Sequence, residues 1–168
     1  MVLTKSELIS SLQKEVRILT HLAGKVDAKV ADYRPTPKQR STLDLLRYMS
    51  IMGPGLVQAA KAGGFDGAAW GAALKESEAR NLQQTVAVIA GQGDVYATLL
   101  GDMSDADLRA EMNNFDGSKI SKGAFIVNLV LGGHAAYRTQ LFLYLKANGH
   151  DALSTYNLWQ GVDAPAKV

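Results

Sequence analysis

Apolar residues recur every three or four positions along most of the chain, which is the period of an amphipathic α-helix. The first such stretch is predicted to run from about residue 5 to residue 31. It opens on Thr4 and Glu7, whose spacing is that of a helix capping box. Pro35 and Pro37 then predict an extended connection, because proline there cannot continue the helix.

A second helix is predicted to start at Ser41, with Asp44 three residues later, and to reach about Ala62. Gly53-Pro54-Gly55 interrupts it, and this run predicts a kink or a break. Trp70 lies in an Ala/Gly-rich segment that favours a short helix.

Two further long helices are predicted, at about residues 82–100 and 121–148, and the second of them ends at Gly149. Ser104 predicts a short helix between them, and no segment is typical of a β-strand. Four long helices in one compact chain predict an all-α protein with a four-helix bundle. We expect a single domain over residues 1–168, with the bundle at about 5–149 and a short tail at 150–168.

The composition excludes several classes of function. The chain has 168 residues, a net charge of +2 and no dense basic run, so no nucleic-acid partner is expected. It has no cysteine, which excludes disulfides, thiolate metal sites and cysteine nucleophiles. The N-terminus lacks a secretory apolar region, and the most apolar stretch, Gly123 to Ala136, is too short to span a bilayer comfortably. We therefore predict a cytoplasmic protein that does not bind membranes.

Two segments resemble the DinB-like (DinB/YfiT-like) superfamily of metalloenzymes. The first is Asp32-Tyr33-Arg34-Pro35-Thr36-Pro37 with the following Arg40-Ser41-Thr42-Leu43-Asp44-Leu45-Leu46, which is similar to the first loop and the start of the second helix. The second is His134-Ala135-Ala136-Tyr137-Arg138-Thr139-Gln140-Leu141, which is similar to the final-helix motif. With the helix order, the resemblance covers about Ser6 to Gly149 and implies a four-helix bundle.

The resemblance also implies a metal site. In that family three histidines, one from the second helix and two from the last, hold a divalent ion, often nickel or zinc. The corresponding positions here are Tyr48, Gly133 and Tyr137, and none is histidine. A neutral tyrosine is a poor ligand for these ions, and glycine has no side chain. We therefore expect no intact metal site and no cofactor, although His134 lies one position from a ligand position.

The sequence leaves more than one role open for His134. One reading is a core histidine that is hydrogen-bonded to Tyr48, Tyr137 or water. Another is a remnant pocket in which Tyr48, His134, Tyr137 and Arg138 bind a small polar ligand. Arg138 is expected to pair with a carboxylate, with Asp44 as a guess from the mapped positions.

Three functions remain open. The first is a bundle that binds a small ligand or a partner without the metal triad. The second is a metal-dependent hydrolase or thiol transferase that uses His134. The third is a structural dimerisation module, because the last helix is apolar nearly all round. A homodimer is expected, and whether the protein is an enzyme stays open.

Overall fold

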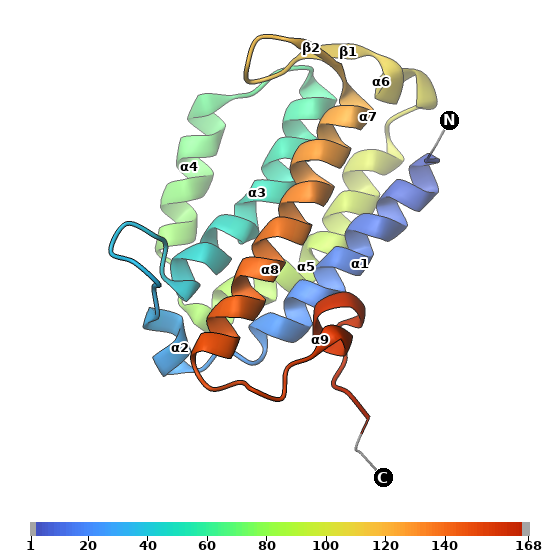
Figure 1. Cartoon of the computed structure of the whole chain (residues 1–168). Coiled ribbons are helices and arrows are strands. Elements are labelled where there is room, and N and C mark those ends of the chain that lie inside the picture. Colours follow the sequence, from blue (N-terminus) through green and yellow to red (C-terminus); the bar gives the residue numbers. More distant parts are fainter. Residues whose placement is uncertain (1–2, 166–168) are drawn as a thin grey trace.

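The computed structural model describes residues 3–165, and its core is a bundle of long helices (Figure 1). They are α1 (Lys5–Ala23), α3 (Thr42–Ala62), α5 (Leu82–Gly101) and a continuous C-terminal helix. The last consists of α7 (Lys122–Phe125), a π-helical segment (Ile126–Leu131) and α8 (Gly132–Ala147). Both α1 and α3 pack against α5, and the C-terminal helix packs against α1 and α3. The predicted all-α four-helix bundle is confirmed.

The core fills the bundle as two clusters of apolar side chains. One cluster includes Leu19, Leu46 and Leu145, and the other includes Leu12 and Val130, all of them fully buried. Burying one such side chain contributes roughly 1.5–3 kcal/mol, so these clusters are the main stabilising element of the fold.

The predicted helix starts have the expected caps. The side chain of Thr4 accepts a hydrogen bond from the backbone N–H of Glu7, and the carboxylate of Glu7 accepts one from the backbone N–H of Thr4. The hydroxyl of Ser41 likewise accepts from the backbone N–H of Asp44 at the start of α3. Each cap satisfies amides that the first helical turn leaves free.

The first helix is shorter than predicted. It ends at Ala23 rather than near residue 31, and a separate short helix, α2 (Ala28–Asp32), follows. The reason is Asp27, whose carboxylate accepts a hydrogen bond from the backbone N–H of Val30 and so caps a new helix. Val26 and Val30 are both buried, so the helical spacing of apolar residues continues across the turn and does not indicate the helix end.

A kink or a break was predicted in the second helix, and the break is wrong, because α3 continues through Gly53-Pro54-Gly55. Both glycines are explained by close neighbours. A Cβ at position 53 would overlap the hydroxyl oxygen of Tyr96, and one at position 55 would lie 3.0 Å from the Trp70 ring. The helix therefore continues across the proline, which lacks one backbone N–H donor, with Tyr96 and Trp70 packed closely against the two glycines.

Between the long helices lie α4 (Gly67–Glu78), α6 (Asp105–Arg109) and a hairpin of β1 (Glu111–Asn113) and β2 (Lys119–Ser121). The expectation of no strand is therefore wrong. The two antiparallel strands have three residues each, which is too short for an alternating pattern to be recognised. Gly117, with a φ of 81°, lies in the connecting turn.

The predicted tail contains a further helix, α9 (Thr155–Gln160), which packs against α1. The side-chain amide of Asn157 lies 3.0 Å from Nε2 of His21, and the Cα of Ile18 would be 3.0 Å from a Cβ at Gly161. Among the described residues, no helix has the length and hydropathy needed to cross a membrane.

Candidate functional site

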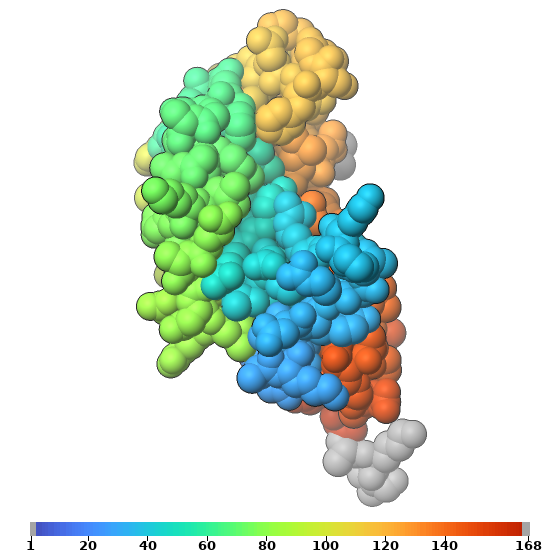
Figure 2. All heavy atoms as spheres, turned by 90° about the vertical axis from the view of Figure 1, so that its left-hand side faces the viewer, coloured from blue at the N-terminus to red at the C-terminus, as the bar shows by residue number. Residues whose placement is uncertain are grey.

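A cleft of about 520 Å³ opens between α3, α4, the π-helical segment and α8. Figure 2 shows this side of the molecule, with α4 in green lying outside α3 in cyan and the hairpin in yellow-orange above them. The aromatic residues that line the cleft come from five separate parts of the chain: Tyr48, Phe65, Trp70, Phe115 and Tyr137. Helices, a loop and the hairpin turn therefore all contribute to one aromatic surface.

Two helices supply the centre of the cleft through residues one turn apart. Tyr48 and Met52 lie four residues apart on α3, and Gly133 and Tyr137 lie four apart on α8. Side chains at this spacing share one face of a helix, so each pair points the same way. The two pairs contact each other: the Tyr48 ring meets the Tyr137 ring, and Met52 lies against Gly133.

The rings meet edge to face. The ring centroids of Tyr48 and Tyr137 are 5.3 Å apart with an interplanar angle of 74°, and those of Tyr48 and Trp70 are 6.2 Å apart at 72°. Phe65 connects Trp70 to Phe115: its ring is tilted by 50° to the Trp70 ring at a centroid distance of 5.4 Å, and it meets the Phe115 ring edge to face at 5.2 Å. This arrangement is the favoured one for aromatic pairs, because a positive ring edge meets a negative ring face.

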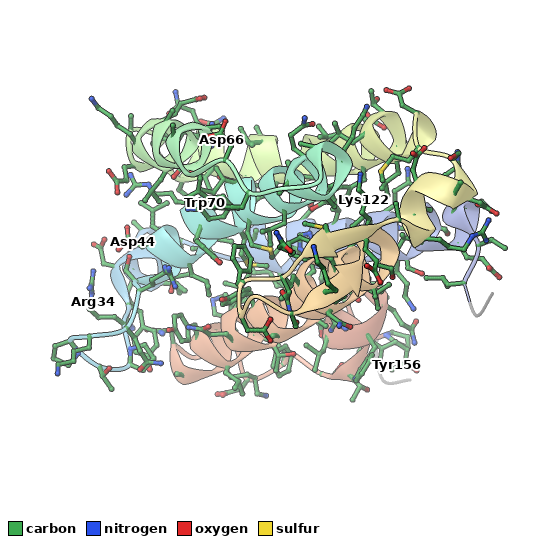
Figure 3. All side chains as sticks on the ribbon, turned by 90° about the horizontal axis from the view of Figure 1, so that it is seen from above. Arg34, Asp44, Asp66, Trp70, Lys122 and Tyr156 are labelled. Atoms are coloured by element: carbon green, nitrogen blue, oxygen red, sulfur yellow. The ribbon has the colours of Figure 1, made fainter. Side chains whose placement is uncertain are left out.

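The helix α4 contributes Trp70 to the wall of the cleft. Seen from above in Figure 3, it lies between α4 and α3. Its ring packs on Gly55, and it also lines a second cavity of about 430 Å³ on the other side, between α3 and α4. The position of α4 against the bundle therefore depends strongly on this one side chain.

The Tyr48 hydroxyl is a neutral group at pH 7. Burial and the neighbouring Tyr137 phenol raise the pKa of Tyr48, while the Arg40 guanidinium opposes that rise. The Cζ atom of Arg40 lies 4.2 Å from the centroid of the Tyr48 ring, as in a cation–π contact. A protonated phenol can both donate and accept a hydrogen bond at the cleft.

Small residues of α8 form the floor of the cleft: Gly132, Gly133 and Ala136. A Cβ at Gly133 would lie 3.1 Å from Cε and 3.4 Å from Sδ of Met52. The absence of a side chain at 133 therefore lets Met52 approach the helix backbone.

His134 does not line this cleft. Its side chain is fully buried, and its Nε2 atom lies 2.6 Å from the hydroxyl oxygen of Tyr96. Gln92 Oε1 is a second, longer contact of that hydroxyl, at 3.5 Å. Within the described part of the chain, Nδ1 of His134 has no hydrogen-bond partner. The reading of a core histidine fits this position, but its partner is Tyr96 rather than Tyr48 or Tyr137.

Both members of the buried pair are neutral. Burial lowers the pKa of His134 to about 4 and raises the pKa of Tyr96 above its usual value. The sequence did not connect Tyr96 with His134. No local signal makes that connection, since the two residues are 38 positions apart.

Arg138 also lies away from the cleft, and its predicted pairing with Asp44 is wrong. Its guanidinium forms a buried ion pair with Glu15 of α1 and donates to the backbone carbonyl of Leu158. The Cζ atom lies 5.1 Å from the centroid of the Trp159 ring. Arg138 therefore ties α1, α8 and α9 together.

Asp44 has partners of its own at the start of α3. Its carboxylate lies 3.4 Å from the guanidinium of Arg34 and 3.3 Å from that of Arg47, and these pairs help lower the pKa of Asp44 against the effect of burial. Of the four predicted site residues, the structure thus brings Tyr48 and Tyr137 together at the cleft. It places His134 and Arg138 elsewhere in the bundle.

The positions that correspond to the family's metal ligands do converge. Tyr48, Gly133 and Tyr137 all line the cleft. Their donor set is two phenols and a residue without a side chain, which does not fit a nickel or zinc ion. Across residues 3–165, no three histidine, aspartate or glutamate side chains are grouped so that they could hold a metal.

Comparison with known proteins gives a likeness of fold. No protein-family model matches the chain, and no curated protein matches its sequence significantly. The structure is similar to the crystal structure of YjoA, a DinB-like protein from Bacillus subtilis. The TM-score is 0.68 and the identity 16%, over 89% of this chain and 96% of that one. It is also similar to YfiT from Bacillus subtilis, with a TM-score of 0.68 and 13% identity over 86% of this chain and 87% of that one.

YfiT is described as a probable metal-dependent hydrolase with an unusual four-helix bundle topology. At these levels of identity the likeness shows the fold alone. The chain has the DinB/YfiT-like fold that its loop and final-helix segments predicted.

Proposed function

We propose that this DinB/YfiT-like bundle binds a small molecule in the aromatic cleft, without a metal ion held by three histidines. The observation that carries the proposal is the convergence of Tyr48, Gly133 and Tyr137 on the cleft. The place where the family's metal would be held is here a hollow with aromatic walls and a glycine floor. Ligand pockets of proteins are typically concave, largely apolar and equipped with a few polar groups.

The polar groups of the cleft suit recognition rather than catalysis. They include the hydroxyls of Tyr48 and Tyr137 and the side-chain amide of Asn128. General base catalysis needs a group within hydrogen-bond reach of the substrate. His134 is fully buried, bonded to Tyr96 and outside the cleft, so the geometry does not favour an enzyme that uses this histidine.

The metal part of the proposal is tested by elemental analysis. Purified wild-type protein is equilibrated with nickel or zinc, desalted and analysed, and we expect substoichiometric metal. The matched control combines Tyr48→His, Gly133→His and Tyr137→His with Met52→Ala, which makes room beside position 133. This variant should retain far more metal than wild type. Stoichiometric metal in the wild-type protein would overturn the proposal.

The binding part is tested through Trp70. The chain has two tryptophans, Trp70 in the cleft and Trp159 near the C-terminus, so a ¹H–¹⁵N spectrum should contain two indole N–H peaks. The Trp159→Phe variant assigns them. We expect small molecules from a chemically diverse set to shift the Trp70 peak and leave the Trp159 peak in place. A set that never moves the Trp70 peak would contradict binding at this cleft.

The homodimer expected from the sequence stays a prediction. Leu143, on α8, is an exposed large apolar residue, with 58% of its surface accessible. Sedimentation at micromolar concentration tests the prediction, and a monomer would contradict it.

A further inference from the structure

We infer that the cleft selects a planar, uncharged aromatic molecule that carries a hydrogen-bonding substituent. This inference rests on the proposed small-molecule function and names the chemical class of the ligand. It follows from three features of the cleft: the charges around it, the angles between its rings, and its floor.

The first feature is the absence of charge. None of the described residues that line the cleft is an aspartate, glutamate, lysine or arginine. An ionised ligand would lose its hydration on entering and would meet no opposite charge among the lining residues, which is unfavourable in an apolar site. An anion would be attracted only by the Arg40 guanidinium, which lies against the Tyr48 ring and is not a lining residue. The raised pKa of Tyr48 is consistent with surroundings that disfavour a negative charge.

Aromatic walls alone also suit an organic cation, because a cation is attracted to the face of a ring. Here Arg40 already lies on the Tyr48 ring, with its Cζ atom 4.2 Å from the centroid. A second cation beside Tyr48 would be repelled by that guanidinium, and no carboxylate among the lining residues offsets the repulsion. A neutral molecule meets neither penalty.

The second feature is the geometry of the rings. Tyr137 and Trp70 stand at 74° and 72° to Tyr48. A flat ring that stacks on one of these walls therefore presents its edge to a neighbouring wall. Stacked and edge-to-face contacts are both favourable for aromatic pairs, so a planar ligand gains from several walls together, whereas an aliphatic one gains only from burial.

The third feature is the floor and the polar groups near it. Gly132 lines the cleft, is exposed and has no side chain, so a planar ring can approach the helix backbone there. The hydroxyls of Tyr48 and Tyr137 and the amide of Asn128 offer donors and acceptors to a substituent on that ring. An uncharged hydroxyl or amide substituent matches these groups.

A series of probes with one skeleton tests the inference. The probes are 2-naphthol, the anion 2-naphthoate, the cation 2-naphthylmethylammonium and the non-aromatic decahydro-2-naphthol. Each is titrated into the full-length protein, and the Kd is read from the shift of the Trp70 indole N–H peak. We expect the Kd of 2-naphthol to be at least tenfold lower than that of each of the other three.

Two variants locate the binding. Ala136→Phe fills the cleft from an exposed position on α8, and should weaken 2-naphthol binding at least tenfold. Thr139→Phe adds the same ring at an exposed α8 position that does not line the cleft, and should leave the Kd unchanged. Arg40→Gln removes the charge over Tyr48, and should lower the Kd of the ammonium probe severalfold without changing that of 2-naphthol.

The outcomes separate this inference from the proposed function. If the naphthoate, the ammonium or the decahydro probe binds as tightly as 2-naphthol, the inferred ligand class is wrong and the binding cleft stands. If none of the four probes shifts the Trp70 peak, the inferred ligand class is wrong, and the proposed function is overturned as well only if the chemically diverse set also leaves that peak in place. A Trp70 peak that moves with protein concentration alone would assign the cleft to a second copy of the chain, and would also overturn the inference.

Discussion

Replacing Gly53 by alanine tests how the centre of the bundle is packed. A Cβ at this position would overlap the hydroxyl oxygen of Tyr96 and lie 2.9 Å from both Cζ of Tyr96 and Nε2 of His134. The substituted residue would therefore have to push the Tyr96 ring away from His134. That movement would break the 2.6 Å contact between the two buried groups.

The expected magnitude combines three effects. Alanine is favoured over glycine in a helix interior by about 1 kcal/mol, which stabilises the variant. Overpacking of a filled core costs roughly 1–3 kcal/mol, and a buried polar group that loses its hydrogen bond costs roughly 1–3 kcal/mol more. With mid-range values, Gly53→Ala should lower the free energy of unfolding by about 3 kcal/mol. In a chain of this size that corresponds to a fall in Tm of roughly 6–12 °C.

Gly91→Ala is the matched control. Gly91 lies inside α5, and a Cβ there would meet no atom within 4 Å. Only the helix propensity changes, so this variant should gain about 1 kcal/mol of stability. The same substitution should thus have opposite signs at the two positions.

Urea unfolding followed by circular dichroism measures both variants, with Tyr96→Phe and the double variant Gly53→Ala/Tyr96→Phe added. Phenylalanine removes the overlapping hydroxyl, so the alanine should cost at least about 1 kcal/mol less in the double variant than alone. If Gly53→Ala changed the stability by the same amount as Gly91→Ala, the close approach of Tyr96 and His134 to this helix would be refuted.

Three other predictions follow from the same contacts. Burial lowers the pKa of His134 from 6.5 to about 4, so the folded state favours the neutral imidazole. This preference contributes fully to the free energy of unfolding above pH 6.5, and about 3 kcal/mol of it is lost as the pH falls to 4. His134→Gln should remove that part of the pH dependence, as measured by urea unfolding across this range; an unchanged slope would contradict the burial of a neutral imidazole. Arg138→Met should lower the free energy of unfolding by about 3–5 kcal/mol, because it leaves the Glu15 carboxylate buried without its partner, and adding Glu15→Gln should recover part of the loss. Trp70→Ala should speed amide hydrogen exchange in α4 selectively, because its packing on Gly55 is a principal contact of that helix with the bundle; uniform exchange rates would argue against it.

Much of the fold could be predicted from the sequence because the relevant signals are local. The caps at Thr4 and Ser41 act over three residues, and an apolar stripe is repeated at every helical turn. The positions of the long helices follow from these signals. Helix ends were less predictable, as the turn before Asp27 shows, because the apolar period continues across it.

The candidate site was predicted only in part. Tyr48 and Tyr137 were expected to lie near each other because the resemblance to DinB-like proteins implies it, and their ring centroids are 5.3 Å apart. Phe65 and Phe115 were missed as members of the cleft, since they lie in a loop and a hairpin turn, where no period indicates which way a side chain points.

By itself, the sequence determined the bundle of helices, their order and the presence of two tyrosines and a glycine at the three positions where the resemblance implies metal ligands. These properties depend on residue identity and on contacts within a few positions. The tertiary structure alone decided that Gly53-Pro54-Gly55 continues a helix, that His134 pairs with Tyr96 and that Arg138 pairs with Glu15. These contacts join residues 38 to 123 positions apart, so they exist only once the helices have packed at definite angles and distances.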